Sequence, residues 1–374
     1  MKKLRGWMLA VGAVVLMATG LCVVSVNELA RNENVASEVE ENNDFTMEVH
    51  FIDVGQGDAT LIESDGHYML IDAGNNDKGT ALQLYLQKQG VKKLDYLVLT
   101  HSDADHIGGA DVIVTKFDVD NVFLGDFEKE NKTYEDLIAA LVYKDLTYST
   151  PMVGSEYMLG NATFTIAAPN RTYEDANNSS IALVLTDGDN TFLFTGDCEE
   201  EAENDILASG VNIDCDVYKI GHHGSRTSSG KTFLEAVTPA YGVISCGVGN
   251  DYGHPHADPL NNLRSMGVQI FRTDEQGSII AYSDGSEITW NCAPSDSWKV
   301  GEPAGNANTA NSNMESGTEN DLLQGDYVIA NKKSGVFHKP TCNGLPKERN
   351  RLIFNSREEA IAAGYDNPCD YCEP

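Results

Sequence analysis

The chain reads Thr100-His101-Ser102-Asp103-Ala104-Asp105-His106-Ile107-Gly108-Gly109 directly after the apolar run 96–99. Such a run is typical of a buried strand, and α/β folds place their chemistry at the carboxyl ends of their strands. The segment offers two imidazoles and two carboxylates. Donors at this density can hold two divalent ions side by side, the arrangement that activates water for hydrolysis. The alternative is a solvated turn rich in Asp and His, which we disfavour because further ligand-like clusters follow along the chain.

Five further motifs accompany this segment in a fixed order. They read Asp53-Val54-Gly55-Gln56-Gly57-Asp58, Leu70-Ile71-Asp72-Ala73-Gly74, Phe194-Thr195-Gly196-Asp197, His222-His223-Gly224-Ser225 and Tyr252-Gly253-His254-Pro255-His256. The set resembles the metallo-β-lactamase superfamily, whose HxHxDH motif has a His where Asp103 stands here. The HxDxDH variant is similar to that of the ComEC-like competence proteins, and the resemblance covers about residues 47–290. The polytopic channel domain that accompanies this module in those proteins has no counterpart in the 374 residues.

The pattern from residue 47 onward predicts a mixed α/β domain. Short apolar runs predict strands over 49–52, 59–62, 68–71, 96–99, 164–167, 181–186, 191–195, 217–220, 241–245 and 279–282. Helical spacing predicts helices over 80–89, 199–209 and 231–237. The family resemblance implies that these elements form a four-layer αββα sandwich over residues 47–292.

We expect His101 and Asp103 to bind one ion, and Asp105 and His106 to bind the other. Adjacent side chains can serve two ions because they diverge when they leave an irregular loop. Asp197 follows an apolar strand, and we expect it to bridge both ions, although a turn Asp after Gly is the alternative. Among these ligands, we expect Asp105 to be catalytic as well.

The pair His222-His223 follows another apolar strand between two glycines. The family resemblance makes His223 the metal ligand and leaves His222 beside it, or in packing. We expect Asp72 to orient a ligand imidazole, as carboxylates around metal sites do. Asp58 has two interpretations, a place near the cleft or a role in the 55–57 turn.

A third His usually enters this family's site between the first cluster and the bridging Asp, but here the region reads Asn177-Asn178-Ser179-Ser180. Together with Asp103, this makes the first metal position oxygen-rich, so we expect Mn²⁺ to compete with Zn²⁺. Occupancy by a single ion is also open. Ser179 and Ser180 are candidates to contact a substrate oxygen.

Two histidines flank Pro255 on a predicted loop. An imidazole there can bind a phosphate oxygen or protonate a leaving group, and we prefer His254 over His256 for this catalytic role. A surface loop with two titratable histidines is the alternative.

Charge and the N-terminus bear on location and substrate. The net charge of −31 disfavours tight non-specific binding to nucleic acid, although bound metal can offset acidic surroundings. Three basic residues among the first five precede an apolar run over 7–26. This segment is typical of an export signal, either cleaved or kept as a membrane anchor. We therefore expect residues 27–46 to be an acidic tether and the body of the protein to lie outside the cytoplasm.

The chain has eight cysteines. Four of them show no obvious pairing and are read as buried thiols; they are Cys198, Cys215, Cys246 and Cys292. The predicted flexible linker 293–325 is rich in Asn, Gly and Ser. It precedes a compact tail over 326–374, with a strand expected at 327–329 and a helix at 356–363.

The tail combines an imidazole with three thiols at zinc-knuckle spacing. It resembles the Ada-like metal-binding domain, and we assign it one structural Zn²⁺ held by His338, Cys342, Cys369 and Cys372. A disulfide among these cysteines is the alternative, since export would favour it.

These observations predict an exported metal-dependent hydrolase with two divalent ions, Mn²⁺ or Zn²⁺, in its active site. A phosphodiester, including DNA, is the expected substrate, and a nuclease is one form of this activity. Hydrolysis of another ester, of phosphorylcholine or lactone type, is the alternative on the same site. A surface-tethered binding module without catalysis is the alternative from another class, and the complete ligand set argues against it.

Overall fold

The computed structural model describes residues 45–301 and, in the C-terminal part, 328–331, 333–339, 351–354, 357–362, 365 and 367–369. The predicted export segment 1–26, most of the acidic tether and residues 302–325 of the predicted linker lie outside the described residues. Within the described part of the chain, no helix has the length and apolar character needed to cross a bilayer.

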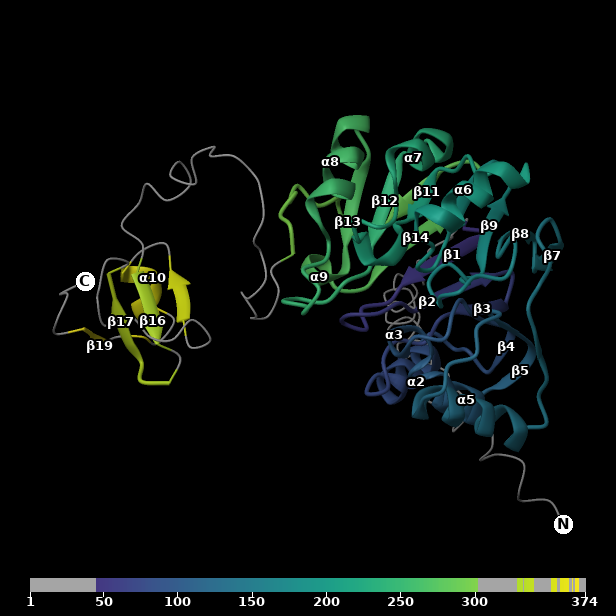
Figure 1. Ribbon diagram of the computed structural model, residues 1–374, viewed down its shortest axis with the longest axis horizontal. Helices are drawn as coiled ribbons and strands as arrows, with labels where there is room; N and C mark the ends of the chain where they lie inside the picture. Colours follow the sequence, from purple (N-terminus) through teal and green to yellow (C-terminus); the bar gives the residue numbers. More distant parts are fainter. Residues whose placement is uncertain are drawn as a thin grey trace, which may run out of the picture. The chain divides into compact units, whose positions relative to one another are not determined.

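Two β-sheets form the centre of the main domain (Figure 1). The first sheet has the strand order β15-β14-β1-β2-β3-β4-β5-β6. Its strands are β1 (Met47–Phe51), β2 (Thr60–Ser64), β3 (His67–Ile71), β4 (Lys93–Leu99), β5 (Asp118–Leu124), β6 (Tyr148–Ser149), β14 (Ile279–Ser283) and β15 (Ile288–Trp290).

The second sheet has the order β13-β12-β11-β10-β9-β8-β7. Its strands are β7 (Glu156–Leu159), β8 (Ala162–Ala168), β9 (Ala182–Asp187), β10 (Asn190–Phe194), β11 (Val217–Lys219), β12 (Tyr241–Ile244) and β13 (Gln269–Arg272). Phe51 and Met69 of the first sheet share one buried core with Phe164 and Phe192 of the second. The two sheets therefore pack face to face.

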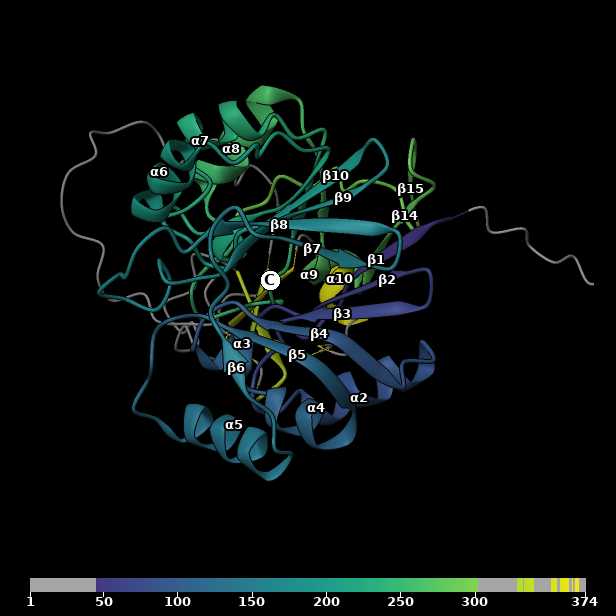
Figure 2. The same cartoon turned by 90° about the vertical axis from the view of Figure 1, so that its right-hand side faces the viewer.

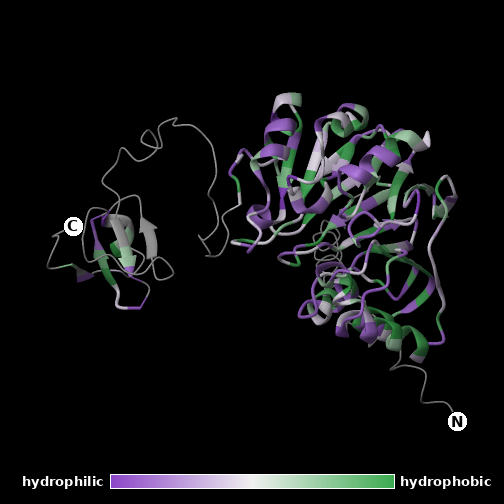
Figure 3. Ribbon diagram, in the orientation of Figure 1, coloured by the Kyte–Doolittle hydropathy of each residue, from purple (hydrophilic) through white to green (hydrophobic). Residues whose placement is uncertain are grey.

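Helices cover the outer face of each sheet (Figure 2). Leu82 of α2 (Gly79–Lys88), Ile113 of α4 (Ala110–Lys116) and Leu137 of α5 (Lys132–Tyr143) pack on the first sheet. The second sheet is covered by α6 (Glu200–Ser209), α7 (Lys231–Val237) and α8 (Ala257–Met266). These helices carry hydrophilic and hydrophobic residues side by side (Figure 3), as expected for helices with one face on a core. The four-layer sandwich predicted from the resemblance is confirmed.

The topology brings the predicted motifs to one edge. Strands β3, β4 and β5 are parallel, as are β10, β11, β12 and β13. Parallel strands end at the same edge of their sheet, and the loops that follow them collect there. The loops after β3 and β4 carry Asp72 and the His101–His106 segment, and those after β10 and β11 carry Asp197 and His223.

The chain stays on the domain beyond residue 292, where we predicted the linker to begin. Ser295 forms a bridge with Ile270, Lys299 O accepts a hydrogen bond from Arg272 Nη1, and Trp298 packs against the core under α6–α8. The predicted start of the linker is therefore too early. The segment is mostly polar, so the sequence did not indicate that Trp298 packs it onto the domain.

The C-terminal part has a sheet of its own, with the order β18-β16-β17-β19. Its elements are β16 (Val328–Asn331), β17 (Val336–His338), β18 (Arg351–Phe354), β19 (Asn367–Pro368) and α10 (Arg357–Ala362). Ala330, Phe337 and Ala360 form its small buried core.

Candidate metal centre

The His101–His106 segment leaves β4 and forms the single turn α3 (Ala104–Ile107). Gly57 makes a close approach here, because a Cβ at this position would lie 2.4 Å from Asp105 O. Its φ of +145° is also one that L residues rarely adopt. The loop of Asp58 can thus lie on α3, and Asp58 N donates to Asp105 O at 3.1 Å.

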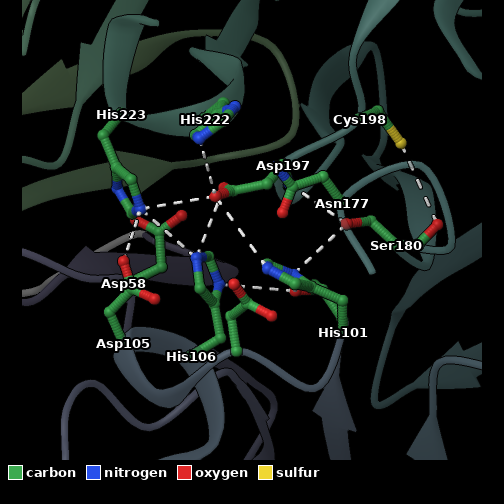
Figure 4. Close-up of polar contacts among 12 residues, drawn as sticks. Asp58, His101, Asp105, His106, Asn177, Ser180, Asp197, Cys198, His222 and His223 are labelled. Carbon is green, nitrogen blue, oxygen red and sulfur yellow. Dashed lines mark hydrogen bonds and ion pairs between the residues drawn. The ribbon is translucent and has the colours of Figure 1, made fainter. Parts of the chain in front are cut away.

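Imidazole and carboxylate donors converge on one point beside Asp197 (Figure 4). His106 Nε2 lies 3.2 Å from His223 Nε2 and 3.3 Å from Asp197 Oδ1. His223 Nε2 lies 3.6 Å from Asp197 Oδ2 and 3.3 Å from Asp105 Oδ2. We call this set the second position; it consists of Asp105, His106, Asp197 and His223. Their arrangement is that of ligands around a shared cation.

Two acceptors fix the tautomers of the ligand imidazoles. His106 Nδ1 donates to Asp72 Oδ2 at 2.8 Å, and Asp72 also accepts from Thr100 N and Thr100 Oγ1. His223 Nδ1 donates to Ser245 O at 3.0 Å. With Nδ1 protonated, each Nε2 keeps its lone pair for a metal. Asp72 therefore has the orienting geometry that the sequence predicted.

Fewer donors define the first position, His101, Asp103 and Asp197. His101 Nε2 lies 3.9 Å from Asp197 Oδ2, while the described partner of Asp103 is Lys129, whose Nζ lies 2.6 Å from Asp103 Oδ1. Of the predicted ligands, His101 thus lies near Asp197 here and Asp103 is held by Lys129, while the imidazole of His222 also approaches Asp197 Oδ2, at 3.6 Å. The assignment of Asp103 as a ligand stays a prediction.

The two predicted serines serve the framework of the site. Ser180 Oγ lies 3.3 Å from His101 Nδ1 and accepts from Asp197 N at 3.1 Å. Ser179 Oγ donates to Asp175 O at 2.7 Å. Both hydroxyls have protein partners, which argues against the predicted substrate contact for either one.

Several buried donor atoms fit a bound cation. Within the described residues, His101 Nε2, Asp58 Oδ1 and Asp197 Oδ1 are buried and have no hydrogen-bond partner. Unpaired buried carboxylate and imidazole atoms are costly, and a divalent ion would satisfy them. One donor atom from each of Asp58, His106, Asp197 and His223 also lies within 4.8 Å of the other three.

Asp58 points to the centre rather than to its own turn. The turn is satisfied by Asp53, whose Oδ1 accepts from Gly55 N at 3.0 Å. Asp58 Oδ2 instead accepts from the buried Lys219 Nζ at 2.9 Å. Lys219 was not predicted as a functional residue, although a lysine inside an apolar strand was a visible signal. Burial alone would raise the pKa of Asp58, but the neighbouring Lys219 and His223 outweigh it. The pKa is therefore lowered, and the carboxylate stays charged.

Electrostatics keep the Asp197 carboxylate ionised. Burial would raise the pKa of Asp197, but the His106 and His223 imidazoles hold it well below its usual range. Burial and the neighbouring His106 lower the pKa of His101, so this imidazole is neutral at neutral pH. A neutral imidazole facing an ionised carboxylate is the state that a metal requires.

His222 lies beside the cluster. Its Nε2 is 3.6 Å from Asp197 Oδ2 and its Nδ1 is 3.4 Å from Glu199 Oε1, in agreement with its predicted place next to the ligands. Both His222 and His223 have positive φ, 50° and 55°. Non-glycine residues adopt this conformation at a cost, and such strain concentrates at functional sites.

The loop that follows β12 adds His254 to the rim of the site. Its ring stacks on that of His223 at 6.0 Å between centroids, and its buried Nδ1 has no partner among the described residues. Burial and the neighbouring His223 lower its pKa to about 3. His254 is therefore neutral at neutral pH, which favours binding of a substrate oxygen over protonation of a leaving group.

His256 holds backbone groups together. Its Nδ1 accepts from Arg226 N at 3.0 Å, and its Nε2 lies 3.2 Å from Tyr252 O. This argues against the predicted substrate contact.

The C-terminal domain places one of its four predicted zinc ligands at the end of β17 and another directly after the neighbouring strand β19. In the parallel pair β17 and β19, Phe337 lies opposite Pro368, and Cys369 N donates to Phe337 O at 2.9 Å. The next residue on β17 is the buried His338, whose Nδ1 has no partner among the described residues. Cys342 and Cys372 lie outside the described residues. The orphaned imidazole fits a structural metal.

The predicted thiols in the main domain are free. Three of them are buried and one is half-buried; they are Cys198, Cys215, Cys246 and Cys292.

Comparison with protein families agrees with both domains. The model described as "Metallo-beta-lactamase superfamily" matches residues 52–143 and 169–248. The model described as "Metal binding domain of Ada" matches residues 317–374.

Curated relatives match the main domain. ComE operon protein 3 of Bacillus subtilis is 31% identical over 252 residues, which are 62% of this chain and 32% of that protein. Recombination protein 2 of Haemophilus influenzae is 30% identical over 240 residues, 63% of this chain and 28% of the relative. Competence protein ComA of Neisseria gonorrhoeae is 31% identical over 230 residues, 61% and 31% of the two chains. The chain thus spans about a third of the length of these relatives.

Solved structures with a similar course of the chain include the metallo-β-lactamase fold protein YhfI from Bacillus subtilis. It has 16% identity and a TM-score of 0.38, and the match covers 60% of this chain and 96% of that one. The family models and the relatives agree with the site geometry. This chain belongs to the metallo-β-lactamase superfamily, carries an Ada-like metal-binding domain at its C-terminal end, and has ComEC-like competence proteins as its homologues.

Proposed function

We propose that this metal-dependent hydrolase is a phosphodiesterase that acts on a nucleic-acid strand, with its body outside the cytoplasm. The observation that carries the proposal is the convergence of His106, His223 and Asp105 on the buried Asp197, whose Oδ1 has no hydrogen-bond partner among the described residues and would be satisfied by a cation. The names of the relatives, which refer to competence and recombination, support a nucleic-acid substrate. The apolar N-terminal segment supports export.

The residues of the chain prepare the site for hydrolysis. A divalent ion held at the second position would polarise a phosphoryl oxygen and lower the pKa of an attacking water. Asp72 and the Ser245 carbonyl keep both ligand imidazoles in the metal-binding tautomer. Asp197 stays ionised, and neutral His254 stands on the rim, where it can hydrogen-bond a phosphoryl oxygen.

The number of ions follows from the difference between the two positions. The second position has three side chains besides Asp197. At the first position, Asp103 pairs with Lys129, and the imidazoles of His101 and His222 lie 3.9 and 3.6 Å from Asp197 Oδ2. We propose that one ion binds tightly and a second binds weakly. Because the first position is rich in oxygen donors, Mn²⁺ should support more activity than Zn²⁺.

The test is a metal titration of the full chain after chelation, with bis-p-nitrophenyl phosphate and with single- and double-stranded DNA as substrates. We expect hydrolysis that depends on the added ion. His106→Ala should lower it at least about a hundredfold, because it removes a ligand of the ion that supplies the chemistry. His67→Ala removes an exposed imidazole that pairs with Asp95, and it should change nothing. Activity that persists in His106→Ala within a few-fold would show that this centre does not perform the reaction.

One observation favours a second candidate substrate, a phosphorylcholine ester. A hollow of about 740 Å³ next to His222 is lined by Asp175, Glu199, Glu200 and Glu201, with Arg226 as the one cation among its lining residues. Carboxylates of this kind suit the trimethylammonium group of choline. Hydrolysis of p-nitrophenyl phosphorylcholine at a higher kcat/KM than bis-p-nitrophenyl phosphate would favour this candidate over a nucleic acid.

A further inference from the structure

The rings of His223, His254 and Tyr252 form a continuous stack that leads out of the metal centre. His223 and His254 stack with centroids 6.0 Å apart and planes inclined by 27°. His254 and Tyr252 follow at 5.5 Å and 17°. The stack begins at a buried metal-ligand candidate and ends at Tyr252, which is 63% exposed. The outer part of the stack is therefore open to another planar ring.

The loop holds Tyr252 in place although its side chain is exposed. The buried amide of Asn250 donates to Gly247 O and His254 O and accepts from the backbone N–H groups of Tyr252 and His254. His256 also contacts Tyr252 O. An exposed aromatic ring on a loop fixed by these bonds is preorganised, so a ligand that stacks on it does not bear the cost of ordering the loop.

Tyr252 also lies near the reacting groups. Burial raises the pKa of its phenol, and the carboxylates of Asp105 and Asp103 raise it further. The same carboxylates, with Asp251 beside them, make the rim unfavourable for an anionic polymer. Stacking on an uncharged ring provides binding energy that this acidic surface does not oppose.

We propose that Tyr252 stacks on an unpaired nucleobase next to the phosphodiester that is cut, so that the substrate is a single-stranded nucleic acid. The inference rests on the proposed phosphodiesterase function and names its substrate class. A base within a duplex is already stacked on both faces, and exposing it costs a few kcal/mol. Stacking of a free base on an aromatic side chain contributes about 1–3 kcal/mol and tolerates any sequence.

The test is a double-mutant cycle in which the tyrosine ring and the substrate base are removed singly and together. Hydrolysis is measured on the full chain with Mn²⁺. Tyr252→Leu removes the ring, Tyr252→Phe keeps it, and Tyr143→Leu changes a tyrosine that is 80% exposed at the end of α5. Each variant is assayed on a single-stranded oligonucleotide, on the same strand with abasic residues at the cleavage site, and on the duplex. Quenching of 2-aminopurine in a cleavage-resistant phosphorothioate tetranucleotide reports stacking without turnover.

We expect Tyr252→Leu to raise KM for the single strand about tenfold, equivalent to about 1.4 kcal/mol, with little change in kcat. It should leave the abasic strand unaffected and abolish the quenching, whereas Tyr252→Phe and Tyr143→Leu should behave as the wild type. An equal loss on the intact and abasic strands would overturn the proposal, because it indicates a structural role. Equal competition by a polyol-phosphate polymer that lacks bases would also overturn it, in favour of a sugar or polyol ligand.

The two proposals fail in different ways. Hydrolysis of DNA without coupling between Tyr252 and the base would leave the phosphodiesterase in place and refute the stacking. Quenching without hydrolysis by any metal-loaded form would refute the phosphodiesterase and leave a site that binds bases.

Discussion

Asp103 occupies the place of a family histidine, and its partner in the structure is an ammonium group. Lys129 Nζ lies 2.6 Å from Asp103 Oδ1, and this pair is partly exposed, so its net contribution to stability is small. Its effect on the site is larger, because a cation next to the first position opposes the binding of an ion there. The two residues together explain why the first position should be the weaker one.

Asp103→His should therefore strengthen the first position. An imidazole does not pair with Lys129 and is a better ligand for Zn²⁺, so we expect the second ion to bind more tightly and the activity optimum to move from Mn²⁺ towards Zn²⁺. Calorimetric titration of the chelated protein gives both affinities. Asp118→His, at an exposed carboxylate on β5, is the control. If the two ions bind the wild type and Asp103→His alike, the argument from ligand type is wrong.

At the residue scale, the sequence was informative where a motif fixes the backbone and uninformative where a partner comes from elsewhere in the fold. The convergence of His106, His223 and Asp197 was predicted from their motifs at the ends of strands together with the family resemblance. The pairing of Lys129 with Asp103 involves residues 26 apart and has no local signal. Tyr252 was visible within a motif, but its role depends on a stack that only the folded loop creates.

At the scale of elements, Glu203 joins α6 to the loop that follows the histidine pair. The side chain is buried, and it accepts hydrogen bonds from Ser229 N and Gly230 N. Burial raises the pKa of Glu203 to about 7, and the neighbouring Glu200 and Glu199 add to the shift. This carboxyl therefore binds its proton more tightly in the folded protein than in the unfolded chain.

The linkage predicts that this group makes the protein less stable as pH rises. Its contribution is complete below the unfolded pKa of about 4.5 and is lost as pH rises to about 7, because over this range the unfolded chain releases the proton while the folded protein still binds it. Glu203→Gln stays neutral, so the difference in free energy of unfolding between it and the wild type should change by about 3 kcal/mol between pH 5 and pH 8. Urea unfolding in the presence of chelator measures it. The exposed Glu235→Gln on α7 is the control, and a difference independent of pH would contradict the prediction.

Sequence patterns predicted the central strands better than the peripheral elements. Strand β9 has a continuous apolar run over 182–185 and β10 has one over 192–194, as expected for strands that are covered on both faces. The prediction did not include β5, whose first half alternates with exposed polar residues. It also did not include α8, where Pro259 and two asparagines weaken the helical signal. These elements depend on the sheets they pack against more than on local preference.

For the whole molecule, we expect the C-terminal domain to be a separate zinc-dependent unit that the chemistry does not need. Its described core consists of three buried residues, too few to offset the entropy of folding without a metal. Chelation should unfold it, and one Zn²⁺ should refold it with release of thiol protons. A chain that ends at residue 301 should hydrolyse small substrates at an unchanged rate.

Cysteine variants separate zinc from a disulfide in this domain. Cys369→Ser should lower zinc content by one ion per chain, while Cys292→Ser, at a half-buried free thiol of the main domain, should not. Mass spectrometry that finds Cys369 and Cys372 joined in the native protein would refute the zinc assignment.

The candidate metal ligands come from loops of both sheets, and this affects how the two sheets are held together. Asp58, Asp72 and the His101–His106 segment come from the first sheet, and Asp197 and His223 come from the second. Neither half of the sandwich holds a complete set of ligands, so an ion bound at this edge would cross-link the two sheets. A metal at a hundred times its dissociation constant adds about 2.7 kcal/mol to the stability of a protein. Here that free energy would stabilise the packing of one sheet against the other. The supply of metal in the surroundings would then set how firmly the two halves of the domain are clamped together.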